Sequence, residues 1–213
     1  MTQQTLAPDP VTCDPATRVT RSLLGYGVLA GVLYEVVSIV QGTTREGFDF
    51  TRHSWSLLAN GSAGWVQITN FVLAGAMTLA FAAGLRRATG LKWAPRLVGA
   101  YGVSLVLAGI FRADPARGFP VGAPETVTWH GMAHLVAGAV GFVCLAVACM
   151  AAGRWFGTGG WAWYSRASGI AILAGFLCVA SGSTAAWATL AFIAGVALAW
   201  VWLAAIAVHL YRR

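Results

Sequence analysis

The chain has 213 residues, of which 58% are hydrophobic and only 10% are charged, and its formal net charge is +7. A soluble domain usually carries about 25% charged residues, so this composition excludes an ordinary soluble globular protein. The natural solvent of such a chain is a lipid bilayer, and we predict an all-α, polytopic membrane protein.

Six apolar segments follow one another along the chain, and most approach the ~20 residues that a helix needs to cross the hydrocarbon core. We predict transmembrane helices at residues 22–42, 64–85, 96–111, 128–150, 166–184 and 187–210. Residues 1–20 are polar and contain several prolines, so we expect a disordered cytoplasmic tail. Residues 21–213 then form a single six-helix transmembrane domain.

The basic residues are distributed unevenly between the two sides of this bundle. The side that holds both termini carries 10 of the 14 basic residues: Arg18, Arg21, Arg86, Arg87, Lys92, Arg96, Arg154, Arg166, Arg212 and Arg213. The positive-inside rule therefore predicts a cytoplasmic-membrane protein with both termini in the cytoplasm. The topology accounts for the net positive charge, so we do not expect nucleic acid as a partner. The expected partner is the lipid bilayer. The sequence specifies no oligomeric state and no cofactor.

Small residues recur at helical spacing in several of the predicted spans. Gly27 and Gly31 lie four residues apart in the first span, Gly141 follows two alanines at this spacing in the fourth, and Gly195 lies between two alanines in the sixth. Small residues at this spacing allow helices to approach one another closely in lipid. They predict a compact bundle and carry no information about activity.

Polar residues gather in the extracytoplasmic thirds of the predicted spans. Glu35 lies seven residues from the outer end of the first span, about 10 Å deep at 1.5 Å per residue. His134 in the fourth span and Asn70 in the second lie at nearly the same depth, and His130 and Gln67 lie closer to the outer surface. These matched depths predict an outward-facing polar pocket within the membrane.

Glu35 is the most unusual residue of the spans. An ionised side chain at the centre of a transmembrane helix is unfavourable by about 2.5–3.5 kcal/mol on insertion scales and usually faces the bundle interior. Glu35 is therefore a candidate acid, base or ligand. The alternative is a carboxyl group that only connects helices through a hydrogen bond, for example to His134.

His130 and His134 are four residues apart, so both rings leave the same face of the helix. This spacing is compatible with structural histidines, with acid–base groups, or with two metal ligands that Glu35 or Asp114 would complete. The sequence has no HExxH motif and no cysteine ligand nearby, and we assign no metal site. We take Glu35, His134, His130 and Asp114 as the candidate catalytic residues.

The candidate binding residues lie in the same layer and in the outer loops. The longest outer loop, residues 43–65, contains charged and aromatic residues and the apolar piece SWSLLA, which suits either an interfacial half-helix or a plain connector. The candidates are Gln67, Asn70, Arg52, His53, Arg112, Trp65 and Trp129.

Several short motifs resemble those of a known family. They are the run FDFTRHSWSLLANGSAGWVQITNF with Arg52, His53, Ser56, Leu57, Gly64, Trp65, Asn70 and Phe71, then Asp114–Pro115, then His130. In these elements the chain resembles the bacterial membrane proteins grouped as domain of unknown function 998. The resemblance covers nearly the whole chain after residue 20 and implies a six-helix membrane protein with no settled activity.

Two classes of function are compatible with these features. The first is a protein that binds, or acts by acid–base chemistry on, a lipid or isoprenoid-like molecule in the outward-facing pocket. The second is a non-enzymatic bundle, such as a small transporter, an accessory subunit or a sensor. Against a transporter, the sequence shows no inverted repeat and no pair of Gly/Pro-broken spans. We expect the first class, and leave open whether the protein is an enzyme.

Overall fold

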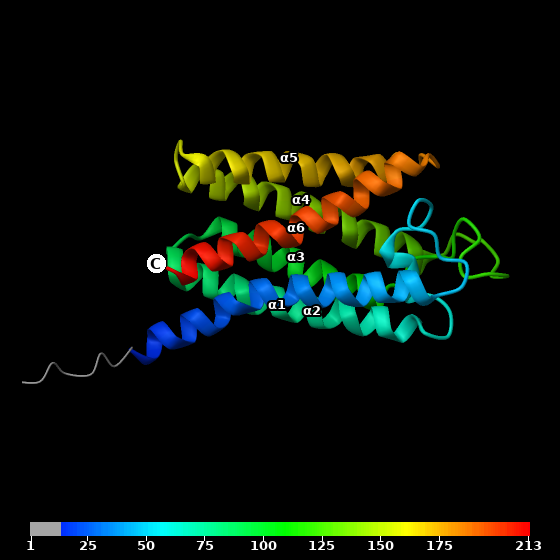
Figure 1. Cartoon of the computed structure of the whole chain (residues 1–213), viewed down its shortest axis with the longest axis horizontal. Helices are drawn as coiled ribbons and strands as arrows, with labels where there is room; N and C mark the ends of the chain where they lie inside the picture. The colour runs from blue at the N-terminus through cyan, green and yellow to red at the C-terminus, as the bar shows by residue number, and fades with distance from the viewer. Residues whose placement is uncertain (1–13) are drawn as a thin grey trace, which may run out of the picture.

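The computed structural model describes residues 14–213, which form six α-helices and one short 3-10 helix (Figure 1). The elements are α1 (Pro15–Thr44), η1 (Trp55–Ala59), α2 (Gly64–Thr89), α3 (Trp93–Ile110), α4 (Trp129–Trp155), α5 (Gly160–Ala180) and α6 (Ala186–Tyr211). All six α-helices are long and apolar enough to cross a membrane. The prediction of an all-α protein with six transmembrane helices is confirmed.

The helices differ from the predicted spans at their ends. Helix α1 begins at Pro15, so residues 15–20 of the predicted tail are helical. Proline is well suited to a first helical turn because its fixed φ matches the helix and its missing N–H has no partner there. The rest of the predicted tail, residues 1–13, lies outside the described residues. Helix α5 also begins early, at Gly160.

The six helices are arranged as a closed ring. Each helix packs against the next along the chain, and α6 packs against α1. Helix α6 runs obliquely across the bundle (Figure 1). Residues 45–63, 111–128 and 181–185 lie at one end of the bundle, which we name the loop end. The start of α1 and Arg213 lie at the opposite end, which we name the termini end.

The predicted small-residue contacts are present between neighbouring helices. A Cβ atom on Gly31 would lie 3.0 Å from the Cβ atom of Trp200, and one on Gly195 would lie 3.5 Å from the Cα atom of Gly175. A Cβ atom on Gly141 would overlap with the hydroxyl oxygen of Ser104. The helix backbones approach closely because these positions carry no side chain.

Candidate functional site

A cavity of about 380 Å³ lies inside the ring, toward the loop end. All six α-helices, η1 and the loop of residues 111–128 contribute lining residues, and most of their side chains are apolar. The volume falls within the roughly 300–1,000 Å³ that is typical of ligand pockets. The ring arrangement thus places this cavity between the helices, toward one end of the bundle.

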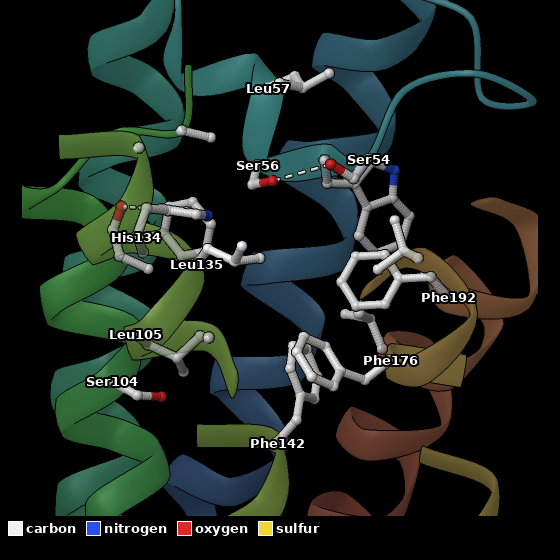
Figure 2. Close-up of a pocket in the computed structure, with 18 of the residues that line it drawn as sticks. Ser54, Ser56, Leu57, Ser104, Leu105, His134, Leu135, Phe142, Phe176 and Phe192 are labelled. Atoms are coloured by element: carbon white, nitrogen blue, oxygen red, sulfur yellow. Dashed lines mark hydrogen bonds between the residues drawn. The ribbon is translucent and has the colours of Figure 1, made fainter. Parts of the chain in front are cut away.

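Aromatic side chains form much of the cavity wall. Tyr34 of α1 packs against Trp55 of η1, with 6.0 Å between the ring centroids. Phe142 of α4 stacks on Phe176 of α5 at 5.1 Å, and Phe192 of α6 packs against Phe142 edge to face at 5.5 Å. Figure 2 shows these three phenylalanines grouped on one side of the cavity. Aromatic and apolar walls of this kind are typical of small-molecule pockets.

His134 is the sequence-predicted residue whose geometry is best suited to a ligand. Its Nδ1 atom lies 2.8 Å from the main-chain oxygen of Phe111 and 3.1 Å from that of Ala108. Because carbonyl oxygens only accept hydrogen bonds, Nδ1 carries the hydrogen, and Nε2 of the neutral ring is an acceptor. Nε2 points into the cavity (Figure 2), and it has no hydrogen-bond partner among residues 14–213.

The cavity is open beside the N-terminal half of α4. Val127, Met132 and Leu135 line it, yet their exposed fractions are 84%, 50% and 50%. Gly138, one turn further along α4, also lines the cavity, and a Cβ atom there would meet nothing within 4 Å. A ligand can therefore enter from the side of the bundle, at the level of the helices themselves.

Asp114 lines the cavity, but its carboxylate is engaged at the start of α4. Thr128 donates to it twice, from the main-chain nitrogen at 2.8 Å and from the hydroxyl group at 2.6 Å. The Thr128 hydroxyl in turn accepts a hydrogen bond from the nitrogen of Gly131 at 3.2 Å. A Cβ atom on Gly131 would overlap with the Asp114 carboxylate. This arrangement is a Thr128 N-cap with the Asp114 carboxylate behind it, and it positions the helix that carries His134.

The structure does not bring Glu35 into the cavity with His134. Glu35 is half-buried in α1, and it is its neighbour Tyr34 that lines the cavity. The Oε1 atom of Glu35 is buried and has no hydrogen-bond partner within residues 14–213. The role of Glu35 as an acid or base thus stays a prediction, without a geometric link to the cavity.

Gln67 and Asn70 lie at the predicted depth, but their side chains face α1. Gln67 accepts a hydrogen bond from Gln41 at 2.8 Å, and Asn70 donates to the main-chain oxygen of Tyr34 at 3.2 Å. Ser38 lies between them, within 3.4 Å of the Gln67 amide oxygen. All four polar side chains of this network are buried. The network connects α1 to α2 and lies outside the set of cavity-lining residues.

His53 and Arg52 organise the loop end. His53 is buried, and it accepts a hydrogen bond from the nitrogen of Asp49 through Nδ1 and donates through Nε2 to the oxygen of Arg117. Arg52 donates to the same oxygen at 3.1 Å. Arg117, which has φ of 59°, donates from its own guanidinium to Thr189 of α6. These residues join the first long loop to the second and to α6.

The remaining candidates are exposed at the rim. Arg112, Trp65, Trp129 and His130 all face outward, and the ring of His130 stacks on that of Trp129 with centroids 3.7 Å apart. His130 and His134 therefore leave the same helix face but have different surroundings. One ring lies on the surface and the other lies against α3.

Sequence reasoning missed Arg45, which is central to the loop end. Its guanidinium donates to the main-chain oxygens of Leu58 and Asn60, each at 2.6 Å, and lies 4.9 Å from the ring centroid of Phe119. Burial lowers the pKa of this guanidinium from its usual value. Arg45 thereby fixes η1 over the cavity. In the sequence, only its position shortly after the first span could have indicated a role for Arg45 at the loop end.

The described histidine, cysteine and carboxylate side chains do not form a metal centre. Within residues 14–213 there is no group of three or more such side chains that could hold a metal ion. The cavity wall is largely apolar and includes the imidazole ring of His134.

These features define a polytopic helical membrane protein whose six spans enclose a cavity that is open to the side. The family model described as "Protein of unknown function (DUF998)" matches residues 28–209. The chain belongs to this family, as its motifs indicated. No curated protein and no solved structure matches the chain.

Proposed function

We propose that the protein binds a lipid or isoprenoid-like molecule, with its apolar chain in the cavity and its polar end at His134. The observation that carries this proposal is the unengaged Nε2 atom of His134, which points into an aromatic-lined, side-open space. Lipid-like molecules combine a long apolar body with one polar end, which is the pattern of this cavity.

The other polar groups of the wall support the assignment of the polar end. The hydroxyl groups of Ser54 and Ser56 are hydrogen-bonded to each other at 2.9 Å (Figure 2), and that of Ser104 donates to the oxygen of Tyr101 at 2.8 Å. Asp114 is engaged by Thr128. His134 Nε2 is an acceptor to which a ligand hydroxyl would donate. A chemical step there would be proton transfer with His134 as the base.

The distribution of basic residues supports a location for the ligand. With both termini in the cytoplasm, as the positive-inside rule predicts, the loop end faces outward and the cavity opens within the outer leaflet. The ligand would then come from, and return to, that leaflet without leaving the bilayer.

Gly138→Leu tests the proposal, because Gly138 lines the cavity, a Cβ atom there meets nothing within 4 Å, and a larger side chain would take up part of the cavity. Gly25→Leu is the matched control, since a Cβ atom at Gly25 also meets nothing within 4 Å, and Gly25 does not line the cavity. Native mass spectrometry of each protein, purified in mild detergent from its own membranes, measures the retained lipid. We expect the parent and Gly25→Leu to retain a lipid-like molecule and Gly138→Leu to lose it by roughly tenfold or more, about 1.4 kcal/mol. Equal retention by both variants, or no retained molecule in the parent, would contradict the proposal.

A further inference from the structure

A second pocket lies at the termini end, where the start of α1 and the ends of α2 and α6 meet. Its volume is about 530 Å³, and it is lined by three arginines, Arg21, Arg87 and Arg213, with Thr20 and Leu24 among the other residues. It is separate from the cavity at the loop end, with which it shares no lining residue. Three elements that are far apart in the sequence thus place three positive charges around one space.

The arginines are held in position by neutral groups. Arg87 of α2 donates to the Thr20 hydroxyl of α1 at 3.0 Å and to the Ala16 oxygen at 3.5 Å. The guanidinium carbon of Arg21 lies 5.5 Å from the ring centroid of Tyr211, and that of Arg213 lies 5.4 Å from the ring centroid of Trp155. Among residues 14–213, no carboxylate forms an ion pair with any of the three.

This arrangement fits an anionic ligand. Three guanidinium groups around one pocket repel one another, and an anion between them removes that repulsion. The planar fork of a guanidinium matches the oxygen atoms of a phosphate and binds them through two parallel hydrogen bonds. The charge pattern therefore favours a ligand with a net negative phosphate group over a ligand whose polar end is neutral or zwitterionic.

The surroundings of the pocket indicate where the phosphate comes from. Leu24 and Leu210 contribute apolar wall, and the lining residues come from residues 16–24 of α1, the last turn of α2, and the C-terminal end of α6 with Arg213 beyond it. Basic pockets between transmembrane helices at this level suit anionic lipid headgroups, whose acyl chains continue along the helices. We infer that this pocket binds the phosphate group of an anionic phospholipid, in the leaflet that faces the termini end.

The test compares two double variants of the full-length protein that remove the same charge. Arg21→Gln/Arg87→Gln removes two lining arginines, whereas Arg86→Gln/Arg96→Gln removes two exposed arginines of α2 and α3 that do not line the pocket. Each protein is reconstituted with dioleoyl phosphatidylglycerol or with dioleoyl phosphatidylcholine, and bound lipid is counted by native mass spectrometry. We expect the first variant to lose binding of phosphatidylglycerol by roughly tenfold or more, and the second to stay within about twofold of the parent.

A further single variant distinguishes the loss of a lining charge from a folding defect. Arg213→Gln lies beyond the end of α6, so it removes a lining charge without a change inside any helix. We expect it to weaken retention of phosphatidylglycerol by roughly threefold to fivefold, with an unchanged melting temperature. Equal losses in the Arg86→Gln/Arg96→Gln variant, or equal retention of phosphatidylcholine by the parent, would overturn the inference. Displacement of phosphatidylglycerol by inorganic phosphate, and not by chloride at the same ionic strength, would overturn the assignment to a lipid.

Discussion

The Nδ1 atom of His134 lies 2.8 Å from the main-chain oxygen of Phe111, so a side chain of α4 satisfies the carbonyl end of α3. The oxygen of Ala108 lies 3.1 Å from the same nitrogen. Carbonyl groups in the last turn of a helix have no partner within that helix. His134 thus connects α3 and α4 through its Nδ1 atom, and its Nε2 atom faces the cavity.

The structural part of this role can be measured with His134→Phe. The variant keeps an aromatic ring but removes the donor, and leaves two carbonyl oxygens unsatisfied in a largely apolar environment. We expect the free energy of unfolding to fall by about 1–3 kcal/mol, measured by thermal unfolding in detergent. His130→Phe, one turn away on the exposed surface, is the control and should change stability by no more than about 0.5 kcal/mol. Equal losses from both variants would show that the Nδ1 hydrogen bonds do not stabilise the protein.

The contact between Gly131 and Asp114 predicts a position where even a methyl group is harmful. Gly131→Ala would place its Cβ atom on the Asp114 carboxylate and displace the cap of α4. We expect a loss of about 1–3 kcal/mol, although alanine is intrinsically the better helix former. Gly138→Ala is the control, because its Cβ atom has open space, and the gain in helix propensity should stabilise the protein by up to about 1 kcal/mol. Thermal unfolding of both variants tests this prediction, and we expect the change in the free energy of unfolding to have opposite signs in the two variants.

The sequence predicted the spans well because the bilayer restricts what can cross it. Each crossing requires a long apolar helix, and the small residues at Gly31 and Gly195 indicated close packing. The ends of the helices were less predictable. Helix α1 extends back to Pro15 because the first helical turn tolerates polar residues, which a search for apolar segments rejects.

The polar residues of the predicted layer do not all face one pocket. Gln67 and Asn70 face α1, whereas His134 faces α3 and the cavity. In a membrane bundle the lipid-facing and interior faces are both apolar, so the hydrophobic pattern does not reveal the rotation of a helix. The cavity itself arises from the way the aromatic side chains pack, which no spacing in the sequence shows.

The hydrogen bonds of Asp49 predict an acid-sensitive loop. Thr51 donates to one carboxylate oxygen from its main-chain nitrogen at 2.8 Å and from its hydroxyl group at 2.7 Å, and these bonds lower the pKa of Asp49. A pKa that is lower in the folded state stabilises the loop above the unfolded value of about 3.9, and this stabilisation is lost as the pH falls through the folded value.

We therefore expect amide hydrogen exchange in residues 49–53 to accelerate once the pH falls below about 4, after correction for the intrinsic pH dependence of exchange. Asp49→Asn should abolish this additional acceleration, because an amide does not titrate. Glu46→Gln removes another exposed carboxylate from the same loop and should leave it unchanged. An acid step that persists in Asp49→Asn would assign the effect to a different group.

The buried amide pair of Gln41 and Gln67 permits a double-mutant cycle. The Gln41 amide nitrogen donates to the Gln67 amide oxygen at 2.8 Å, and both side chains are buried. Gln67→Leu alone leaves the Gln41 donor without a partner, so we expect a loss of about 1–3 kcal/mol, and Gln41→Leu should behave similarly. The double variant replaces both partners by apolar groups and should lose less than the sum of the two, with a coupling energy of about 0.5–3 kcal/mol. Chemical unfolding in detergent measures all four proteins, and strictly additive losses would show that the pair contributes no specific coupling between α1 and α2.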